Sequence, residues 1–227
     1  MNKILVIAAH PDDEILGLGA TIKKHTLSGD IAECIILGEG LTSRDNELDV
    51  TSKSQIQSLH ENALSSGEII GYSKIYFGGF PDNSFDSVPL LKIIKYVENI
   101  IDEFNPNIIY THHSGDRNID HRITFDAVLT ATRPTIHSSI NEIYTFETPS
   151  STEWAFNDKE TLFNPNIFID ITNTIEYKLK AMECYITEIR DYPHPRSLEA
   201  LKIIAKRWGT VVGKNYVEAF HLVRKKD

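Results

Sequence analysis

Apolar runs and amphipathic stretches alternate along most of the chain. Short runs of consecutive apolar residues, such as KILVIAAH at 3–10, are typical of strands buried on both faces of a sheet. Longer stretches with apolar residues every three or four positions are typical of helices. The pattern predicts strands at 3–10, 31–40, 74–80, 106–113, 141–149 and 165–171, and helices at 14–29, 52–71, 88–104, 121–134, 174–189 and 198–209.

Strands that are apolar throughout and alternate with helices indicate a mostly parallel sheet with helices on both faces. Because crossovers between parallel strands are right-handed, we expect an α/β, Rossmann-like doubly wound fold. No internal repeat or low-complexity linker interrupts the pattern, so we expect a single domain over 1–227, with an irregular segment near 148–165. Exposed strand edges and the C-terminal helices leave a homo-oligomer open.

Composition narrows the classes of partner. The formal net charge of −9 argues against a nucleic-acid partner, since an acidic chain releases no counterions from phosphates. Only MNK precedes the first strand, too little for a signal peptide, and no apolar run approaches the length of a membrane span. Cys34 and Cys184 lack the spacing of a metal site and are expected in the core. We therefore expect a cytoplasmic protein with no membrane partner.

Polar clusters follow two of the predicted strands. His10, Asp12 and Asp13 come directly after the first strand, and His112 and His113 end the strand at 106–113. In open α/β sheets, ligands bind at the carboxyl ends of the strands, so neighbouring strands would bring both clusters to one crevice. Adjacent carboxylates repel each other unless a cation or a proton relieves them. A divalent metal would do so.

A catalytic zinc site has three protein ligands and one open position for water. His10 and one of the two aspartates would supply two ligands. The third would be His121, which opens the helix at 121–134, or one of its rivals, His112 and His113. The carboxylate left over would act as a general base toward water activated by the metal.

Two alternatives need no metal. Asp12 or Asp13 could cap the first helix, and Asp120 could cap the helix that begins at His121. The run GLGA at 17–20 hints at a dinucleotide loop, but it lies inside a predicted helix and lacks the GxGxxG spacing. Small residues there favour close packing of the helix on the sheet.

The sequence AHPDDE after the first strand, followed by DH at the start of a later helix, resembles the PIG-L (LmbE-like) family of zinc-dependent N-deacetylases. The motifs and the α/β pattern cover 1–146. The segments THHSGDRNIDHR, TFETPSSTEW and YPHPRSLEAL resemble one bacterial branch of that family. The resemblance implies hydrolysis of the N-acetyl group of an amino sugar, such as an N-acetylglucosamine conjugate, with one zinc ion per chain.

The resemblance also implies roles for individual residues. His10, Asp13 and His121 would be the zinc ligands, and Asp12 the general base that takes a proton from the zinc-bound water. That water would attack the acetamide carbonyl, while zinc and a nearby donor stabilise the oxyanion. Asp120, beside the third ligand, completes the catalytic set.

One departure from the family pattern concerns the oxyanion. Many members have H-P-D-H where this chain has Asn118-Ile119-Asp120-His121. Asn118 can donate a hydrogen bond but cannot carry a positive charge or shuttle a proton. His194, held between two prolines, is the first candidate to replace the missing histidine, and His113 is the second. The alternative for His194 is a turn that leads into the last helix, with Ser197 as its N-cap.

Substrate contacts are expected from arginines near these motifs. The resemblance places a substrate arginine after the second strand, where Arg44 stands. Arg117 and Arg196 lie near the histidine motifs, and either guanidinium could hold a sugar hydroxyl or a phosphate. His113 is included among the substrate-binding residues. The competing hypothesis is a nucleotide- or carbohydrate-binding protein on the same fold, with metal but without turnover. The runs GLGA and GGF hint at nucleotide binding, and the asparagine at position 118 favours a carbohydrate-binding protein that has lost catalysis.

Overall fold

The computed structural model describes residues 1–41, 50–136, 138–156 and 161–226. Its strands are β1 (Lys3–Ala8), β2 (Ile31–Gly38), β3 (Lys74–Phe80), β4 (Ile108–His112), β5 (Glu142–Phe146), β6 (Ile167–Asp170) and β7 (Val217–Lys225). Its α-helices are α1 (Asp13–Leu16), α2 (Gly19–Leu27), α3 (Val50–Ile70), α4 (Leu90–Phe104), α5 (Ile119–Ala131), α6 (Ile175–Glu183) and α7 (Leu198–Val212). Short 3-10 helices are η1 (Phe85–Ser87) and η2 (Thr152–Ala155).

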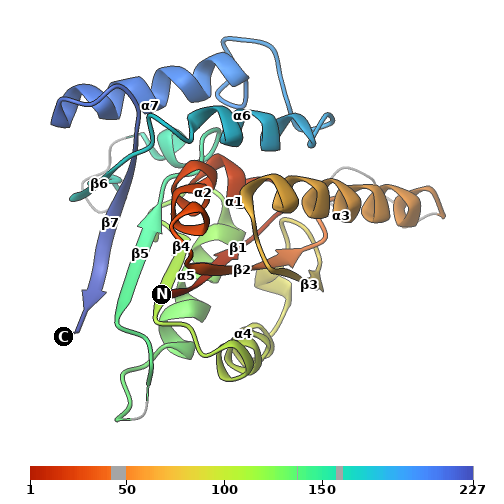
Figure 1. Cartoon of the computed structure of the whole chain (residues 1–227). Coiled ribbons are helices and arrows are strands. Elements are labelled where there is room, and N and C mark those ends of the chain that lie inside the picture. The colour runs from red at the N-terminus through yellow and green to blue at the C-terminus, as the bar shows by residue number, and fades with distance from the viewer. Residues whose placement is uncertain (42–49, 137, 157–160, 227) are drawn as a thin grey trace.

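The strands form one sheet in the order β3-β2-β1-β4-β5-β7-β6. The five strands from β3 to β5 are parallel, while β7 runs antiparallel to both β5 and β6. Helices α1, α2, α3, α6 and α7 cover one face, and α4 and α5 cover the other (Figure 1). The mostly parallel sheet with two helical layers confirms the expected Rossmann-like class.

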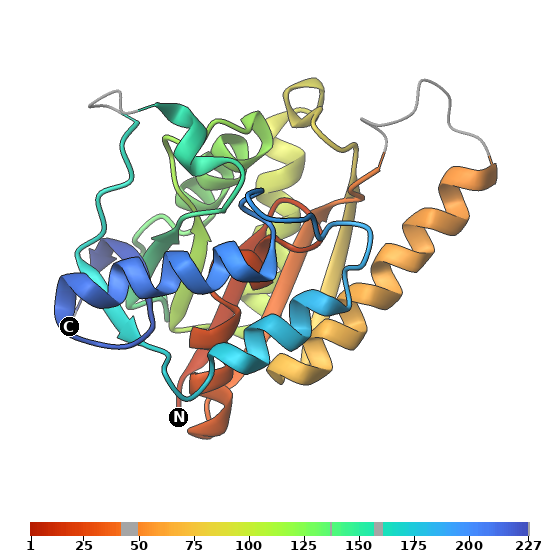
Figure 2. The ribbon, with the colours of Figure 1, turned by 90° about the horizontal axis from the view of Figure 1, so that it is seen from above.

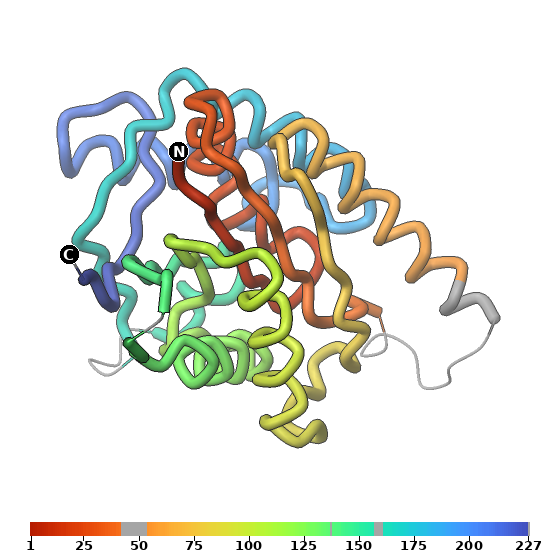
Figure 3. Tube along the Cα trace, turned by 60° about the horizontal axis from the view of Figure 1, so that its bottom comes forward, coloured from red at the N-terminus to blue at the C-terminus, as the bar shows by residue number. Residues whose placement is uncertain are grey.

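Each face of the sheet has its own apolar core. Ile4, Val6 and the buried side chains of α2 and α6 pack on one face, whereas Leu5, Ile7 and those of α4 and α5 pack on the other. Figure 2 shows α3, α6 and α7 lying across the first face, and Figure 3 shows α4 and α5 in front of the second. Because β1 is buried on both sides, its sequence is apolar at every position from Ile4 onward.

Two elements differ from the sequence-based expectations. The pattern did not predict β7, which inserts between the last two predicted strands. The helix expected at 14–29 is two helices, because the chain turns at Gly17 and Leu18. A Cβ on Gly17 would lie 2.3 Å from Cδ2 of Phe146, so glycine permits the close approach of this turn to β5.

Of the two cysteines, Cys34 is buried in the core as expected, but Cys184 is partly exposed at the end of α6. The expectation of core packing is therefore wrong for Cys184, because this residue lies on the same side of the chain as exposed Lys180 and Glu183, whereas Ala181, Met182 and Tyr185 are buried. Within the described residues, no helix combines the length and the apolar character needed to cross a bilayer.

Candidate metal centre and active site

The polar clusters predicted at two strand ends meet because their strands are neighbours. β1 and β4 pair in parallel, with Ile7 opposite Thr111, so the loops that follow them leave the same edge of the sheet. The loops after β3 and β5 leave that edge too. His112, at the end of β4, therefore lies next to the residues that follow β1, with its Nε2 3.4 Å from Oδ2 of Asp13. His113 instead lines a different cavity, so the expectation of one shared crevice is wrong for this residue.

Three side-chain atoms at this crevice form a compact triangle. Nδ1 of His10 lies 3.5 Å from Oδ2 of Asp13, Nε2 of His121 lies 3.3 Å from the same oxygen, and the two nitrogens are 3.3 Å apart. Zinc bonds of about 2.0–2.1 Å in a tetrahedron place two ligands about 3.3–3.4 Å apart. The three atoms therefore have the spacing of one face of a tetrahedral zinc site.

The rival histidines are engaged elsewhere. His112 accepts a hydrogen bond from the backbone N–H of Ala9 at its Nε2 (2.8 Å), and its Nδ1 lies 3.2 Å from Oγ1 of Thr148. Burial, together with the charge of His121, lowers the pKa of His112 to about 3, so this ring is neutral. It stacks on the His121 ring at 3.9 Å between centroids and so helps to orient it. His113 instead contacts the carbonyl oxygen of Thr161 (2.9 Å) and lines a different cavity.

In both histidines of the triangle, a carboxylate lies against the ring nitrogen that is not part of the triangle. Oδ2 of Asp120 lies 2.9 Å from Nε2 of His10, and Oδ1 of Asp116 lies 3.1 Å from Nδ1 of His121. Such pairs fix the ring orientation and the tautomer of metal-binding histidines. Asp82 also approaches Nε2 of His10, at 3.2 Å. A histidine that offers Nδ1 to an ion keeps its proton on Nε2, so Asp82 and Asp120 receive this N–H instead of forming a second ion site.

Sequence reasoning missed Asp116. Its carboxylate accepts hydrogen bonds from the backbone N–H of Asn118 (2.8 Å), from Oγ1 of Thr152 (2.6 Å) and from the hydroxyl of Ser151. It joins the loop after β4 to the loop after β5 while it faces His121. An acidic residue in the loop before a histidine-bearing helix was the available signal, but the partners come from a segment more than thirty positions away.

The electrostatics of the triangle favour positive charge. Burial disfavours a charged His10 ring, but hydrogen bonds with Asp120 and Asp13 outweigh burial and raise the pKa of His10 to about 10. Burial likewise disfavours charge on His121, and Asp13 and Asp116 raise its pKa to about 9. Burial opposes the ionisation of Asp13, yet His121 and the other rings hold its pKa well below the usual range. A divalent cation fits such a surplus of acidic groups.

Asp12 is placed beside the triangle in an unusual backbone conformation. Its φ of 97° lies in the left-handed region, which costs a non-glycine residue about 1–3 kcal/mol and is concentrated at functional sites. The Glu14 carboxylate accepts the backbone N–H of Asp12 (3.1 Å) and receives the hydroxyl of Tyr185 (2.5 Å), which supports this conformation. Burial raises the pKa of Asp12 to about 7, against the opposing charge of Arg196.

The capping alternatives are wrong for these aspartates. Asp12 occupies the N-cap position of α1 without a side-chain cap hydrogen bond, and Asp13 accepts the backbone N–H of His10 (2.8 Å). The N-cap of α5 is Asn118, whose Oδ1 accepts the backbone N–H of Asp120 (2.8 Å). Asp12 and Asp13 therefore line the cavity at this crevice, whereas the Asp120 carboxylate is held by His10 and by the backbone N–H of Phe85 (3.0 Å).

A small polar cavity of about 100 Å³ surrounds these groups. Its lining residues are His10, Pro11, Asp12, Asp13, Gly40, Leu59, Asp82, Asn83, Asn118, His121, Thr148, Ser150, Ser151, Glu188 and Arg196. Nη1 of Arg196 pairs with Asp12 (3.2 Å) and with buried Glu188 (3.0 Å), and its Nε donates to Ser150 (2.7 Å). Glu188 was not predicted, and no sequence signal pointed to it.

Three predicted residues lie away from this cavity. Arg117 is exposed, and His113 and His194 do not line the cavity. His194 packs its ring edge-on against Trp154 and accepts the backbone N–H of Arg196 (3.1 Å), while Ser197 caps α7 as the alternative predicted. Arg44 lies outside the described residues.

Comparison with known proteins agrees with this geometry. The sequence profile of the PIG-L family, described as GlcNAc-PI de-N-acetylase, matches residues 5–132 of the 227-residue chain, which include all three members of the triangle. The chain belongs to the PIG-L family. This membership confirms the N-deacetylase class predicted from the sequence.

Relatives of this PIG-L chain include named deacetylases. It is 26% identical over 235 residues to a diacetylchitobiose deacetylase of Thermococcus kodakarensis, covering 98% of this chain and 84% of the relative. The structure of an N,N'-diacetylchitobiose deacetylase from Pyrococcus horikoshii superposes with a TM-score of 0.78 at 22% identity, covering 98% of this chain and 84% of that one.

The fold also carries another reaction. The structure of GalB, a 4-carboxy-2-hydroxymuconate hydratase from Pseudomonas putida, superposes on this PIG-L chain with a TM-score of 0.77 at 18% identity, covering 100% of this chain and 98% of GalB. Likeness at this identity shows the fold alone, so the reaction has to be argued from the site.

Proposed function

We propose that this protein is a zinc-dependent hydrolase that removes the N-acetyl group from an N-acetylated amino sugar. The observation that carries the proposal is the triangle formed by His10, Asp13 and His121, whose three edges of 3.3–3.5 Å match a tetrahedral zinc site. These residues would hold one ion per chain. When bound, zinc supplies Lewis acidity, which lowers the pKa of water and polarises a carbonyl.

Asp12 is the proposed general base. It lines the same cavity as the triangle, and its buried carboxyl has a pKa of about 7, close to the value that suits proton transfer in both directions. It takes a proton from the attacking water and returns it to the amine as the amide bond breaks. Arg196 holds one of its oxygens at 3.2 Å and so fixes the direction in which the carboxyl points.

Asn118 is the proposed donor to the oxyanion. It lines the cavity and has an amide N–H₂ group, one hydrogen of which is donated to Asn83 (2.9 Å). His194, the first candidate from the sequence, does not line the cavity in this conformation. Asp120 would act through His10, whose Nε2 it holds at 2.9 Å, and is a positioning residue.

The acidic lining of the cavity and the names of the relatives support a substrate class. The amine produced by deacetylation is a cation, and Asp12, Asp82 and Glu188 line the cavity as carboxyl groups that would bind it. Relatives named for diacetylchitobiose favour an N-acetylglucosamine-type sugar. Arg196 and Asn83 would contact the sugar. A cytoplasmic location and a single domain remain part of the proposal.

Metal content and acetate release test the proposal together. Wild-type protein reconstituted with zinc should hold about one zinc per chain, and His121→Ala should lose it because the triangle loses one corner. His221→Ala is the matched control, because this histidine lies on β7 outside the cavity. Zinc-loaded wild type should release acetate from N,N'-diacetylchitobiose, and Asp12→Asn should abolish the release while keeping the zinc.

Each contrary result has a distinct meaning. Wild-type protein without stoichiometric zinc would overturn the metal site. Protein that binds zinc and the sugar but releases no acetate from any N-acetylated sugar would favour the carbohydrate-binding alternative instead.

A further inference from the structure

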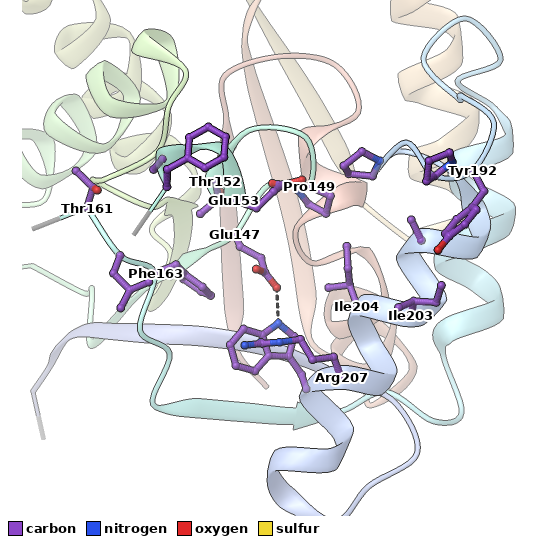
Figure 4. A pocket seen from close by; sticks show the side chains of 17 residues that line it. Glu147, Pro149, Thr152, Glu153, Thr161, Phe163, Tyr192, Ile203, Ile204 and Arg207 are labelled. Carbon is purple, nitrogen blue, oxygen red and sulfur yellow. Dashed lines mark hydrogen bonds between the residues drawn. The ribbon is translucent and has the colours of Figure 1, made fainter. Parts of the chain in front are cut away.

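A second and larger cavity lies beside the metal cavity. It has a volume of about 440 Å³, within the range of roughly 300–1,000 Å³ that small-molecule sites occupy. Its walls come from 147–156, 161–163, 192–195 and helix α7. Figure 4 shows Thr161 and Phe163 on one side, Tyr192, Ile203 and Ile204 on the other, and Glu147 with Arg207 between them.

The rim of this cavity exposes large apolar side chains. Phe156 is 83% exposed, Tyr192 55%, Leu162 49% and Ile203 46%, and all four line the cavity. Four exposed apolar side chains around one hollow differ from the single exposed apolar residues that are scattered over any protein surface. The cavity is therefore suited to an apolar ligand group.

The two carboxylates in its walls, those of Glu147 and Glu153, are bound within the protein. The Glu147 carboxylate accepts the indole N–H of Trp208, and the Arg207 guanidinium lies 3.9 Å from the centre of that ring. The Glu153 carboxylate accepts the backbone N–H groups of residues 150 and 151. Because both carboxylates already have partners, they offer little to the hydroxyl groups of a sugar ring, and the exposed apolar side chains favour an alkyl or aryl group.

Two segments of chain separate the two cavities. Ser150 and Ser151 line the metal cavity, while their direct neighbours Pro149 and Thr152 line the apolar one. The same change of side occurs at 195–196, where Arg196 faces the metal cavity. Neighbouring residues of these two segments thus line different hollows, so the two hollows lie side by side along them.

The metal cavity is too small for a whole substrate. Its 100 Å³ would enclose the acetamide end of an amino sugar, and the remainder must extend outward. We propose that the second cavity binds an apolar aglycone, an alkyl or aryl group attached to the amino sugar. This inference rests on the proposed deacetylase function and makes an apolar glycoside of N-acetylglucosamine the preferred substrate class.

Binding of glucosides that lack the acetamide tests the cavity without any turnover. Calorimetric titration of zinc-loaded protein with hexyl, phenyl and methyl β-D-glucosides should show at least about tenfold tighter binding of the hexyl or the phenyl compound than of the methyl one. Tighter binding of hexyl alone would identify an alkyl aglycone, and of phenyl alone an aryl one. Equal affinity for all three would overturn the proposal.

A pair of variants on one helix locates the binding. Ile203→Glu places a charge in the cavity wall and should remove the preference for the apolar glucosides. Val211→Glu is the matched control, since Val211 is an exposed apolar residue of α7 that does not line the cavity, and it should bind as the wild type does. Loss of the preference in both variants, or in neither, would contradict the assignment.

Substrate kinetics separate this inference from the deacetylase proposal. We expect kcat/KM for acetate release to be at least about tenfold higher for hexyl or phenyl than for methyl N-acetyl-β-D-glucosaminide, and Ile203→Glu to remove the difference. Equal values for all three glycosides would refute the aglycone site and leave the deacetylase intact. Tight, Ile203-dependent binding with no acetate released from any glycoside would refute the deacetylase and leave the apolar site.

Discussion

A buried ion pair beneath the metal site should be essential for stability. Lys178 of α6 and Glu218 of β7 are about 95% buried, and Nζ of Lys178 donates to Glu218 (2.6 Å) and to the carbonyl oxygen of Leu16 at the end of α1 (2.8 Å). The Glu218 carboxylate also accepts the backbone N–H groups of Ala20 (3.3 Å) and Thr21 (2.7 Å). The pair therefore joins four elements at the turn between α1 and α2.

Lys178→Met removes one charge and leaves the other buried without a counter-charge. Breaking such a pair costs about 3–5 kcal/mol, whereas a surface pair contributes about 0–1 kcal/mol. For a chain of this size, each kcal/mol shifts Tm by about 2–4 °C, so we expect Tm to fall by about 10 °C. Lys202→Met is the matched control, because Lys202 pairs with Glu176 at 3.0 Å on the exposed surface and should shift Tm by less than about 4 °C.

Urea unfolding followed by circular dichroism measures both free-energy changes. The double variant Lys178→Met/Glu218→Gln should recover part of the loss, because no unpaired charge remains and glutamine can still accept from Thr21. The reasoning is refuted if Lys178→Met loses no more free energy of unfolding than Lys202→Met, or if the double variant is less stable than Lys178→Met.

Two further variants test the metal site and the start of helix α7. Asp120→Asn should weaken zinc binding about 10–100-fold without unfolding the protein, because it weakens the contact with Nε2 of His10. Competition with a coloured chelator measures the zinc affinity, and an unchanged affinity would show that this contact is unimportant. Ser197→Ala removes the hydroxyl that accepts the backbone N–H of Ala200 (3.0 Å) at the start of α7, and it should lower the free energy of unfolding by about 1 kcal/mol. Wild-type stability of this variant in a urea titration would contradict the prediction.

Much of the fold could be predicted from the sequence because strands buried on both faces read as nearly continuous apolar runs. β1, β2 and β4 are the strands at the centre of the sheet, and their residues face a helical layer on each side, so the pattern was unambiguous. β7 was missed for the opposite reason. Its residues include Glu218, a buried acid that becomes acceptable only through Lys178 of a distant helix, so its strand pattern depends on tertiary structure.

In the candidate site, too, some residues could be predicted from the local sequence and others depend on tertiary structure. His10 and Asp13 follow β1, and the rule for ligands in α/β sheets is enough to place them at the crevice. For the third ligand, the pattern left His121, His112 and His113 open, and only the resemblance to the PIG-L family selected His121, which lies in α5. The acids that hold or adjoin them could not be found this way. Asp116 finds its hydroxyl partners in the loop after β5, and Glu188 reaches the crevice only because the chain returns after α6. Nothing in their local sequence encodes these distant partners.

The same distinction explains why the residues proposed to contact substrate were harder to predict than the triangle. An ion fixes its ligands to within a few tenths of an ångström, so the motif that supplies them is short and recognisable. A sugar or an aglycone can be held by many side chains, and here the walls come from three loops and one helix. Arg196 could be found because it lies beside a histidine and two prolines that attract notice, but Glu147 and Ile203 have no such neighbours. The specificity of this enzyme class is therefore best sought in the walls of the second cavity, where the sequence is least informative.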